Sequence, residues 1–284
     1  MKLLAIDGNS IINRAFYGIK LLSTKSGLYT NGIYGFMNIL GKLCDMESPD
    51  GIAVAFDLKA PTFRHKEYAE YKAGRKPMPE ELRGQFPLLK RLLTLMGYTC
   101  IEKEGFEADD ILGTLAHICE TTGNTCVIAT GDRDSFQLVS DKTHVLLSAT
   151  KAGRPEITEY TPETIMEKYG VTPPQIIDIK ALQGDASDNI PGVAGIGEKT
   201  AGELIRNYGS IDRIYDELDT LDIRDSLRIK LAAGRDMAFL SRGLGTICRT
   251  VPIETDIESY RIGDRNDLEL ARLLHQLEFF GMLQ

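Results

Sequence analysis

The stretch that decides the fold runs from Glu104 to Leu138 and reads EGFEADDILGTLAHICETTGNTCVIATGDRDSFQL. Its first half has apolar residues at helical spacing, which predicts an amphipathic helix with carboxylates in its first turn. Its second half contains a β-branched run, Thr125 to Thr130, which predicts a strand between two glycines. Carboxylates therefore stand at a helix N-terminus and at a strand C-terminus, namely Glu107, Asp109, Asp110, Asp132 and Asp134.

Each of the two acidic groups has an ordinary structural explanation. Acidic residues in a first turn favour the helix dipole by about 0.3 to 1 kcal/mol, and Gly-Asp after a strand is common turn chemistry. A strand–helix–strand unit, however, brings its connected ends close together. Like charges at about 4 Å repel by roughly 1 to 4 kcal/mol, so we expect a bound cation. An all-oxygen ligand set favours Mg²⁺, with Mn²⁺ as its substitute, over zinc.

Two further apolar runs each end at an aspartate. Lys2 to Ile6 precedes Asp7, and Gly51 to Phe56 precedes Asp57. Ligands of open α/β sheets gather at the carboxyl ends of the strands, so three strands followed by aspartates predict a site at that edge. Helices are expected over 33–44 and 82–96, and a further strand over 144–149.

Residues 60–85 differ in character from the rest of the chain. They contain few aliphatic residues, three aromatic residues and a basic group, followed by two prolines. A solvated connector is one interpretation of such a stretch. A contact to a single nucleic-acid strand, through stacking and phosphate pairing, is the alternative that we favour beside a metal site. We expect this stretch to order only when DNA is bound.

The C-terminal part contains a second acidic group and a glycine-rich hairpin. A helix is expected over 175–182, and Asp185 and Asp188 follow it. The segment IPGVAGIGEKTAGELIRNYG, residues 190–209, fails both the dinucleotide and the P-loop patterns. It favours a short helix, a glycine hairpin and a second helix from Glu198, whose backbone N–H groups would hold a phosphate. A plain turn between helices is the alternative.

Composition sets broad limits. The chain has 284 residues, a formal net charge of −8 and five cysteines without CxxC spacing. No stretch is suited to cross a membrane, and the run at residues 3–6 is too short for a signal peptide, so we expect a cytoplasmic protein with reduced thiols. The negative charge argues against a nucleic-acid partner. Assigning nine of the 41 acidic residues to metal nearly balances the remainder against 33 lysines and arginines, which removes that objection.

The motifs together resemble those of the flap-endonuclease family of 5′ nucleases, and most closely the 5′-3′ exonuclease domains of bacterial polymerases. The resemblance covers essentially the whole chain. It rests on Ile6-Asp7-Gly8, Phe56-Asp57, Glu107-Ala108-Asp109-Asp110, Thr130-Gly131-Asp132-x-Asp134, Gly184-Asp185-x-x-Asp188-Asn189 and the hairpin from Gly192 to Lys199.

The resemblance implies an α/β fold with a mixed, mainly parallel central sheet flanked by helices, of the PIN-like or resolvase-like type. It also implies a helical arch at residues 60–85 over the site and a helix–hairpin–helix subdomain. We expect the nuclease core over residues 1–184 and the helical DNA-binding region over 185–284.

The same resemblance assigns residue roles. The first metal would be held by Asp7, Asp57, Glu107 and Asp109, and the second by Asp132, Asp134 and Asp185, with Asp110 and Asp188 contributing directly or through water. Lys72, Arg75 and Arg14 would be the basic catalytic residues. DNA contacts would come from Tyr71, Lys76, Gly192, Gly195, Gly197 and Lys199, with K⁺ at the hairpin.

We therefore expect a structure-specific 5′ nuclease, acting on DNA with 5′ flaps or at single-strand/double-strand junctions by a two-metal-ion mechanism. A monomer is expected, either independent or part of a larger polymerase chain. A phosphatase using Asp7 as nucleophile is disfavoured because Asn9 stands where a second carboxylate is usual. A non-catalytic junction-binding module is the alternative from another class.

Overall fold

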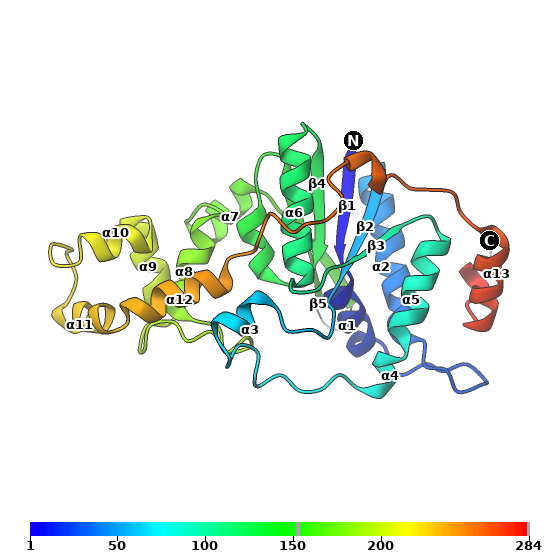
Figure 1. The fold of residues 1–284 in the computed structure, drawn as a ribbon, viewed down its shortest axis with the longest axis horizontal. Helices are drawn as coiled ribbons and strands as arrows, with labels where there is room; N and C mark the ends of the chain where they lie inside the picture. The colour runs from blue at the N-terminus through cyan, green and yellow to red at the C-terminus, as the bar shows by residue number, and fades with distance from the viewer. Residues whose placement is uncertain (152–153, 283–284) are drawn as a thin grey trace.

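The computed structural model describes residues 1–151 and 154–282 and has a six-stranded sheet in the order β3-β2-β1-β4-β5-β6 (Figure 1). The strands are parallel except β6, which is antiparallel to β5. Their bounds are β1 Lys2–Asp7, β2 Gly51–Phe56, β3 Thr99–Glu102, β4 Thr125–Thr130, β5 Thr143–Lys151 and β6 Arg154–Tyr160.

The central strands are buried on both faces because their side chains alternate between two apolar cores. On β1, Leu4 and Ile6 face one core, and Leu3 and Ala5 face the other. Helices α1 (Gly8–Gly18), α2 (Asn31–Glu47) and α5 (Gln85–Leu95) cover the first face, and α6 (Ala108–Thr121) covers the second (Figure 1). This three-layer arrangement is the α/β fold expected from the sequence.

Several sequence-based expectations for single elements need adjustment. The helix expected over 82–96 is two helices, α4 (Glu80–Arg83) and α5, which meet at Gly84. Strands β3 and β6 had no predicted counterpart. The hairpin region has no helix between residues 190 and 197; the helix before it is α8 (Gln175–Gln183), and the one after it is α9 (Glu198–Tyr208).

The arch at residues 60–85 is helical only at its ends, in α3 (Phe63–Glu67) and in α4. Residues 68–79 between them are turns and irregular backbone, and the segment runs below the sheet in Figure 1. The predicted helical arch is therefore present as a separate segment, but its middle is not helical. Five of its residues are buried, so the arch is anchored more firmly than its composition indicates; they are Thr62, Arg64, Tyr71, Leu82 and Gln85.

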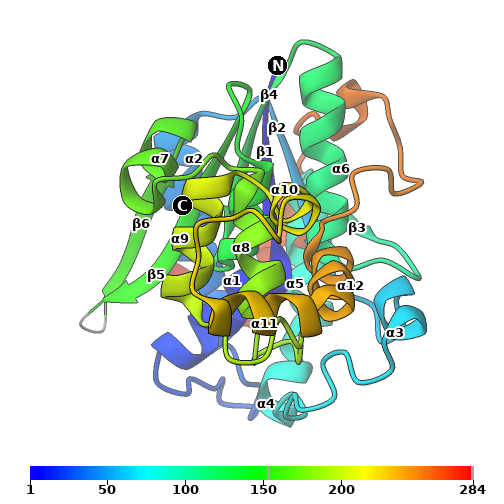
Figure 2. The same cartoon turned by 90° about the vertical axis from the view of Figure 1, so that its left-hand side faces the viewer.

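The C-terminal helices form a second body with its own core, which includes Val171, Leu182 and Leu204 (Figure 2). Helix α13 (Asp267–Gln276) instead returns to the sheet, where Leu270, Leu273 and Leu274 join the core beneath α5. The elements of the structure not yet given are η1 Arg133–Leu138, α7 Pro162–Tyr169, α10 Ile211–Asp216, α11 Asp225–Ala233, α12 Arg235–Gly245, η2 Ile257–Tyr260 and η3 Phe280–Met282. Among the described residues, no helix combines the length and apolar character that crossing a bilayer requires.

Candidate active site

Three predicted aspartates lie at the carboxyl ends of neighbouring central strands. Asp7 is the last residue of β1, Asp57 follows β2, and Asp132 follows β4 by two residues. Because β2, β1 and β4 are adjacent and parallel, the three side chains meet at one edge of the sheet. The sequence-based placement of the site at this edge is what the topology produces.

Helix α6 brings two more carboxylates to the same edge. Glu107 is its N-cap residue and Asp109 lies in its first turn. The helix start is fixed to β2, since the Ala108 N–H donates to Asp57 Oδ1 at 2.8 Å. All five carboxylates, with Asp188, line one hollow of about 370 Å³.

Asp109 is the most crowded of these acids. Burial, and then the charges of neighbouring carboxylates, raise the pKa of Asp109 well above its ordinary value. Those neighbours are Asp7, Asp132, Asp134 and Asp57. Its Oδ1 atom is buried and accepts no hydrogen bond from any residue that the structure describes. An unpaired buried carboxylate oxygen is costly, so this position calls for a cation.

Asp7 is held in place by neutral donors. Its carboxylate accepts hydrogen bonds from the Ser10 N–H at 2.8 Å and the Thr130 hydroxyl at 2.9 Å. Burial nevertheless raises the pKa of Asp7 to about 7, with the charges of Asp57 and Asp132 acting in the same direction. Burial also raises the pKa of Asp57.

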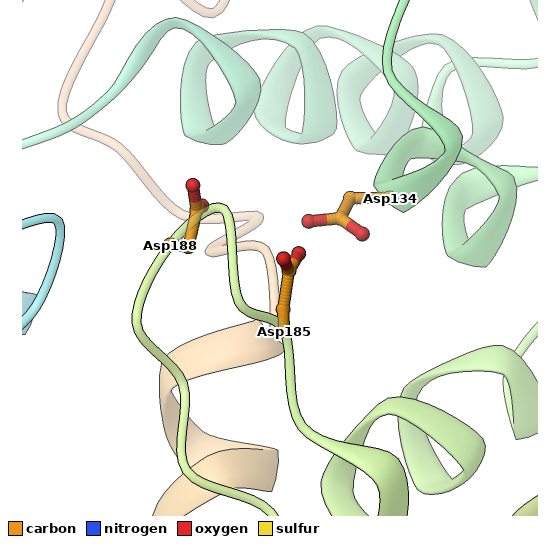
Figure 3. A group of neighbouring side chains, drawn as sticks. All are labelled: Asp134, Asp185 and Asp188. Carbon is orange, nitrogen blue, oxygen red and sulfur yellow. The ribbon is translucent and has the colours of Figure 1, made fainter. Parts of the chain in front are cut away.

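A second acidic group lies beside the first. Asp134, Asp185 and Asp188 each offer an oxygen, and these oxygens lie within 4.8 Å of one another (Figure 3). Asp185 and Asp188 come from the loop after α8, and Asp134 faces them from η1 (Figure 3). Burial and the charge of Asp132 raise the pKa of Asp134 to about 6. Asp132 lines the hollows on both sides, between the two groups.

Lys180 of α8 lies in this second group and was missed in the sequence. Its ammonium contacts Asp134 Oδ2 and lies 2.8 Å from Asp185 Oδ2. Although burial alone would raise it, hydrogen bonds from Lys180 and Ser187 lower the pKa of Asp185 to about 2. In the sequence, Lys180 and Asp185 are five residues apart with a helix end between them. This spacing did not indicate that their side chains meet.

Asp110 does not point into either group. Both of its oxygens accept hydrogen bonds from the Arg64 guanidinium, at 2.7 and 2.8 Å, and it also accepts from two backbone N–H groups. Its side chain is fully buried. Direct metal ligation by Asp110 is therefore corrected to a positioning role, because its acceptor sites are already occupied.

The arch cations lie on carboxylates of the site. Lys72 Nζ is 2.7 Å from Glu107 Oε1, and Arg75 is 2.5 Å from Asp188 Oδ1. Lys72 adopts a left-handed backbone with φ of +58°, held by its N–H bond to the Asp188 carbonyl. Strained backbone of this kind is common at functional sites.

Tyr71 differs from its predicted role as a DNA contact. It is buried, its hydroxyl donates to Glu107 Oε2 at 3.1 Å, and its ring packs with Ile190 and Leu244. Burial and two neighbouring carboxylates raise the pKa of Tyr71, which keeps the phenol protonated. The ring is enclosed and not available for stacking on a base, so Tyr71 anchors the arch.

The remaining predicted basic residues border the site. Arg14 of α1 donates to the Gly131 carbonyl at 2.6 Å and lies across Gly131, where a Cβ would meet its Nε at 1.8 Å. Gly131 directly precedes Asp132, so this contact joins Arg14 to the loop that carries Asp132. Lys76 is exposed and lines the same hollow as the first carboxylate group.

The glycine hairpin joins α8 to α9. Gly195 and Gly197 are exposed, Lys199 is exposed in the first turn of α9, and Gly195 has φ of +77°. Gly192 is instead buried: its N–H donates to the Ser241 hydroxyl at 2.9 Å, and a Cβ there would lie 2.3 Å from the Gly184 nitrogen. Its predicted DNA contact is therefore wrong, because its donor is already used inside the protein.

The residues at the sheet edge fit divalent metal ions. The donor set consists of carboxylate oxygens without histidine or thiolate, which suits Mg²⁺ or Mn²⁺. Burial and neighbouring carboxylates raise the pKa values of Asp7 and Asp109, and Asp109 has an unpaired oxygen, so a divalent cation would be stabilised among these groups.

Two family models of 5′ nucleases match the chain. Residues 2–170 match the family model of the 5′-3′ exonuclease N-terminal resolvase-like domain, and residues 171–267 match that of the 5′-3′ exonuclease C-terminal SAM fold. The chain therefore belongs to the 5′-3′ exonuclease family.

Relatives span the whole chain. DNA polymerase I of Caldicellulosiruptor bescii is 46% identical over 284 residues, which are 100% of this chain and 33% of that protein. DNA polymerase I of Bacillus subtilis is 41% identical over 283 residues, which are 100% of this chain and 32% of that protein. The chain thus spans about a third of the length of the curated relatives it matches.

Solved structures share the fold. The T5 5′-exonuclease with bound zinc has a TM-score of 0.70 at 24% identity, covering 97% of this chain and 99% of that one. The catalytic core of Rad2 with a DNA substrate has a TM-score of 0.65 at 17% identity, covering 97% and 87%. The family resemblance, the fold class and the nuclease assignment made from the sequence are confirmed, and the phosphatase and binding-module alternatives are set aside.

Proposed function

We propose that this chain hydrolyses DNA phosphodiester bonds at 5′ ends and 5′ flap junctions, using two divalent metal ions, Mg²⁺ in the first instance. The observation that carries the proposal is the meeting of two carboxylate groups around Asp109, whose Oδ1 is buried and unpaired. When bound, such ions activate the attacking water and stabilise the leaving oxygen of an in-line displacement.

The first group would consist of Asp7, Asp57, Glu107 and Asp109, and the second of Asp134, Asp185 and Asp188, with Asp132 between them. This amends the sequence-based division by moving Asp188 into the second group, for which the 4.8 Å grouping is the support. Asp110 would act by fixing the start of α6, through its ion pair with Arg64 and its hydrogen bond from the Glu107 N–H.

The basic residues would position the DNA. Lys72 and Arg75 would leave their carboxylates for the scissile phosphate, where their charge stabilises the transition state. Arg14 would orient the loop that carries Asp132. Lys76 would contact the single strand entering the same hollow.

The hairpin would bind the duplex backbone through the α9 N-terminus, with Gly195, Gly197 and Lys199 contacting phosphate. The predicted K⁺ has weaker support, because the Gly195 carbonyl already accepts a hydrogen bond from Lys230 at 3.2 Å. A cytoplasmic monomer, acting as part of a larger polymerase chain or alone, completes the proposal. The domain division after residue 184 is part of it as well.

Replacement of Asp109 by Ala tests the metal centre. We expect turnover in Mg²⁺ on a labelled flap substrate to fall by orders of magnitude, because the most crowded carboxylate is lost. Asp132→Ala should behave in the same way, and DNA binding in Ca²⁺ should persist in both variants. Asp141→Ala is the matched control, since Asp141 is exposed and precedes β5 at the opposite edge of the sheet. Near-normal cleavage by the Asp109→Ala protein would overturn the assignment.

A further inference from the structure

The second carboxylate group already contains a cation that belongs to the protein. Lys180 Nζ contacts Asp134 Oδ2 and lies 2.8 Å from Asp185 Oδ2. The Lys180 side chain is 8% exposed, so this ammonium is nearly removed from water. Two carboxylates in contact with one ammonium favour its charged form.

Lys180 contacts one oxygen of each aspartate, Oδ2 of Asp134 and Oδ2 of Asp185. Asp185 has no other free acceptor, because its Oδ1 accepts from the Ser187 N–H at 2.7 Å and the Ser187 hydroxyl at 2.6 Å. A cation that is to bind both Asp134 and Asp185 at Oδ2 must therefore displace the ammonium or share these oxygens with it. Both options weaken binding, because two positive charges would lie within a few ångströms of each other.

In the first group, the cations of the described residues contact only Glu107. Asp7 accepts hydrogen bonds only from neutral donors, and Asp109 Oδ1 has no partner among the described residues. Lys72 Nζ lies 2.7 Å from Glu107 Oε1 and the Arg64 guanidinium lies 3.5 Å from Glu107 Oε2, and both side chains come from the arch rather than from a core helix. The two groups therefore differ in how much protein charge a divalent cation has to displace.

A hollow lies beside the Lys180 ammonium. Lys180 lines a hollow of about 910 Å³ that extends to Lys199 and Arg206 on α9. The stem of Lys180 lies along Gly245 of α12, where a Cβ would be 3.4 Å from its Cδ.

We propose that Lys180 is an internal counter-ion that competes with a divalent cation for Asp134 and Asp185, so that the second site binds metal more weakly than the first in the free protein. This inference rests on the two metal groups of the proposed function. Lys180 is thus a positioning residue that sets the order in which the two groups fill.

Titration with Mn²⁺ alone, followed by calorimetry and by the signal of free Mn²⁺ in electron paramagnetic resonance, tests the inference without DNA. In Lys180→Met and Lys180→Gln we expect second-site affinity to rise at least tenfold, or about 1.4 kcal/mol. First-site affinity should be unchanged, and it reports that the variant is folded. Lys180→Arg keeps the charge and should keep the second site weak. Adding Asp185→Asn to Lys180→Met should abolish the gain.

Lys168→Met is the matched control. Lys168 lines the same hollow, but its ammonium donates to the Tyr160 hydroxyl at 3.0 Å and contacts neither Asp134 nor Asp185. An equal gain in this variant would show a general charge effect and overturn the inference. So would an unchanged or weaker second site in both Lys180 variants. A protein that binds two Mn²⁺ ions in this order yet cleaves no DNA would instead overturn the proposed function and leave the role of Lys180 intact.

Discussion

Arg64 and Asp110 form a buried bidentate ion pair that joins the base of the arch to the helix carrying Glu107 and Asp109. The two guanidinium nitrogens lie 2.7 and 2.8 Å from the two carboxylate oxygens. Arg64 also donates to the carbonyls of Leu244 and Thr246, at the end of α12. One side chain therefore connects the arch, α6 and the C-terminal helices.

Replacing Arg64 with Ala should destabilise the protein by about 3 to 5 kcal/mol, because a buried carboxylate and two carbonyls lose their donor. Urea unfolding monitored by circular dichroism measures this loss. Arg64→Lys should recover only part of it, since an ammonium lacks the planar fork that matches a carboxylate.

The exposed pair of Arg91 and Glu269, 3.4 Å apart, provides the comparison. Arg91→Ala should change the free energy of unfolding by less than about 0.5 kcal/mol. If Arg64→Ala had an equally small effect, the ion pair would not be what attaches the arch.

Stability without metal should fall as the pH rises. In the folded protein burial raises the pKa of Asp7 to about 7 and that of Asp134 to about 6, both above the ordinary value of 3.8. Between pH 3.8 and these raised pKa values, the folded state still binds protons that the unfolded state has released. The free energy of unfolding therefore decreases as the pH rises through this range. We expect a decrease on the order of 1 to 3 kcal/mol from about pH 5 to about pH 7.5 in EDTA, measured by urea unfolding.

Divalent metal should remove this decrease, because it replaces the protons as the positive charge in the site. Asp7→Asn should make the pH dependence in EDTA shallower. Asp185 acts in the opposite direction, but its pKa of about 2 places its contribution below the window measured. A rise in stability with pH in EDTA would show that the carboxylates are not crowded in the way described.

The sequence predicted those features that local pattern determines. Strands followed at once by Asp7 and Asp57, and the helix start at Glu107, could be recognised because period, glycine bounds and first-turn acids are local signals. The parallel sheet then placed their side chains together. Edge strand β3, Thr99–Glu102, carried too little pattern, because its four residues are neither fully buried nor alternating.

The sequence did not predict which distant charged side chains pair with one another. Arg64, Lys72 and Arg75 are similar cations in one basic stretch, yet Arg64 is buried on Asp110 while Arg75 is half-exposed. Lys180 looked like any helix lysine, although it lies inside an acidic group. Which cation meets which carboxylate depends on how distant segments pack, and no spacing in the chain encodes that.

The hairpin offers a test of backbone recognition. Lys199→Ala should weaken duplex binding by about the same factor for every sequence, because a phosphate contact carries no base information. The slope of log affinity against log salt should decrease by about one contact. Fluorescence anisotropy with several unrelated duplexes measures both quantities. Lys42→Ala is the control, since Lys42 is an exposed lysine of α2 on the other flank of the sheet. A loss confined to some duplexes would contradict this role for the hairpin.

Lys72 should affect the chemical step more than binding. In the DNA-free protein its ammonium lies 2.7 Å from Glu107 Oε1 and 3.8 Å from Asp188 Oδ2, on a strained backbone that holds it over the site. A phosphate entering between these groups would exchange one anion for another around the same ammonium, so the net gain in binding is small. Charge that develops on the phosphoryl oxygens during cleavage would strengthen the contact, and this gain appears only in the transition state.

Lys72→Ala should therefore lower the single-turnover rate by about 10²-fold or more while affinity in Ca²⁺ changes only a few-fold. Lys76→Ala should show the opposite division, because Lys76 is exposed in the same hollow and the structure gives it no carboxylate partner among the described residues. Hydrogen exchange adds a second readout. Release of Lys72 and Arg75 from their carboxylates should change the exchange rates of the backbone amides of residues 72–76 when a flap substrate binds in Ca²⁺. A change in these exchange rates would show that the arch moves when DNA binds. Unaltered exchange in residues 72–76, together with a Lys72→Ala defect confined to affinity, would show that the arch cations hold the DNA and take no part in its cleavage.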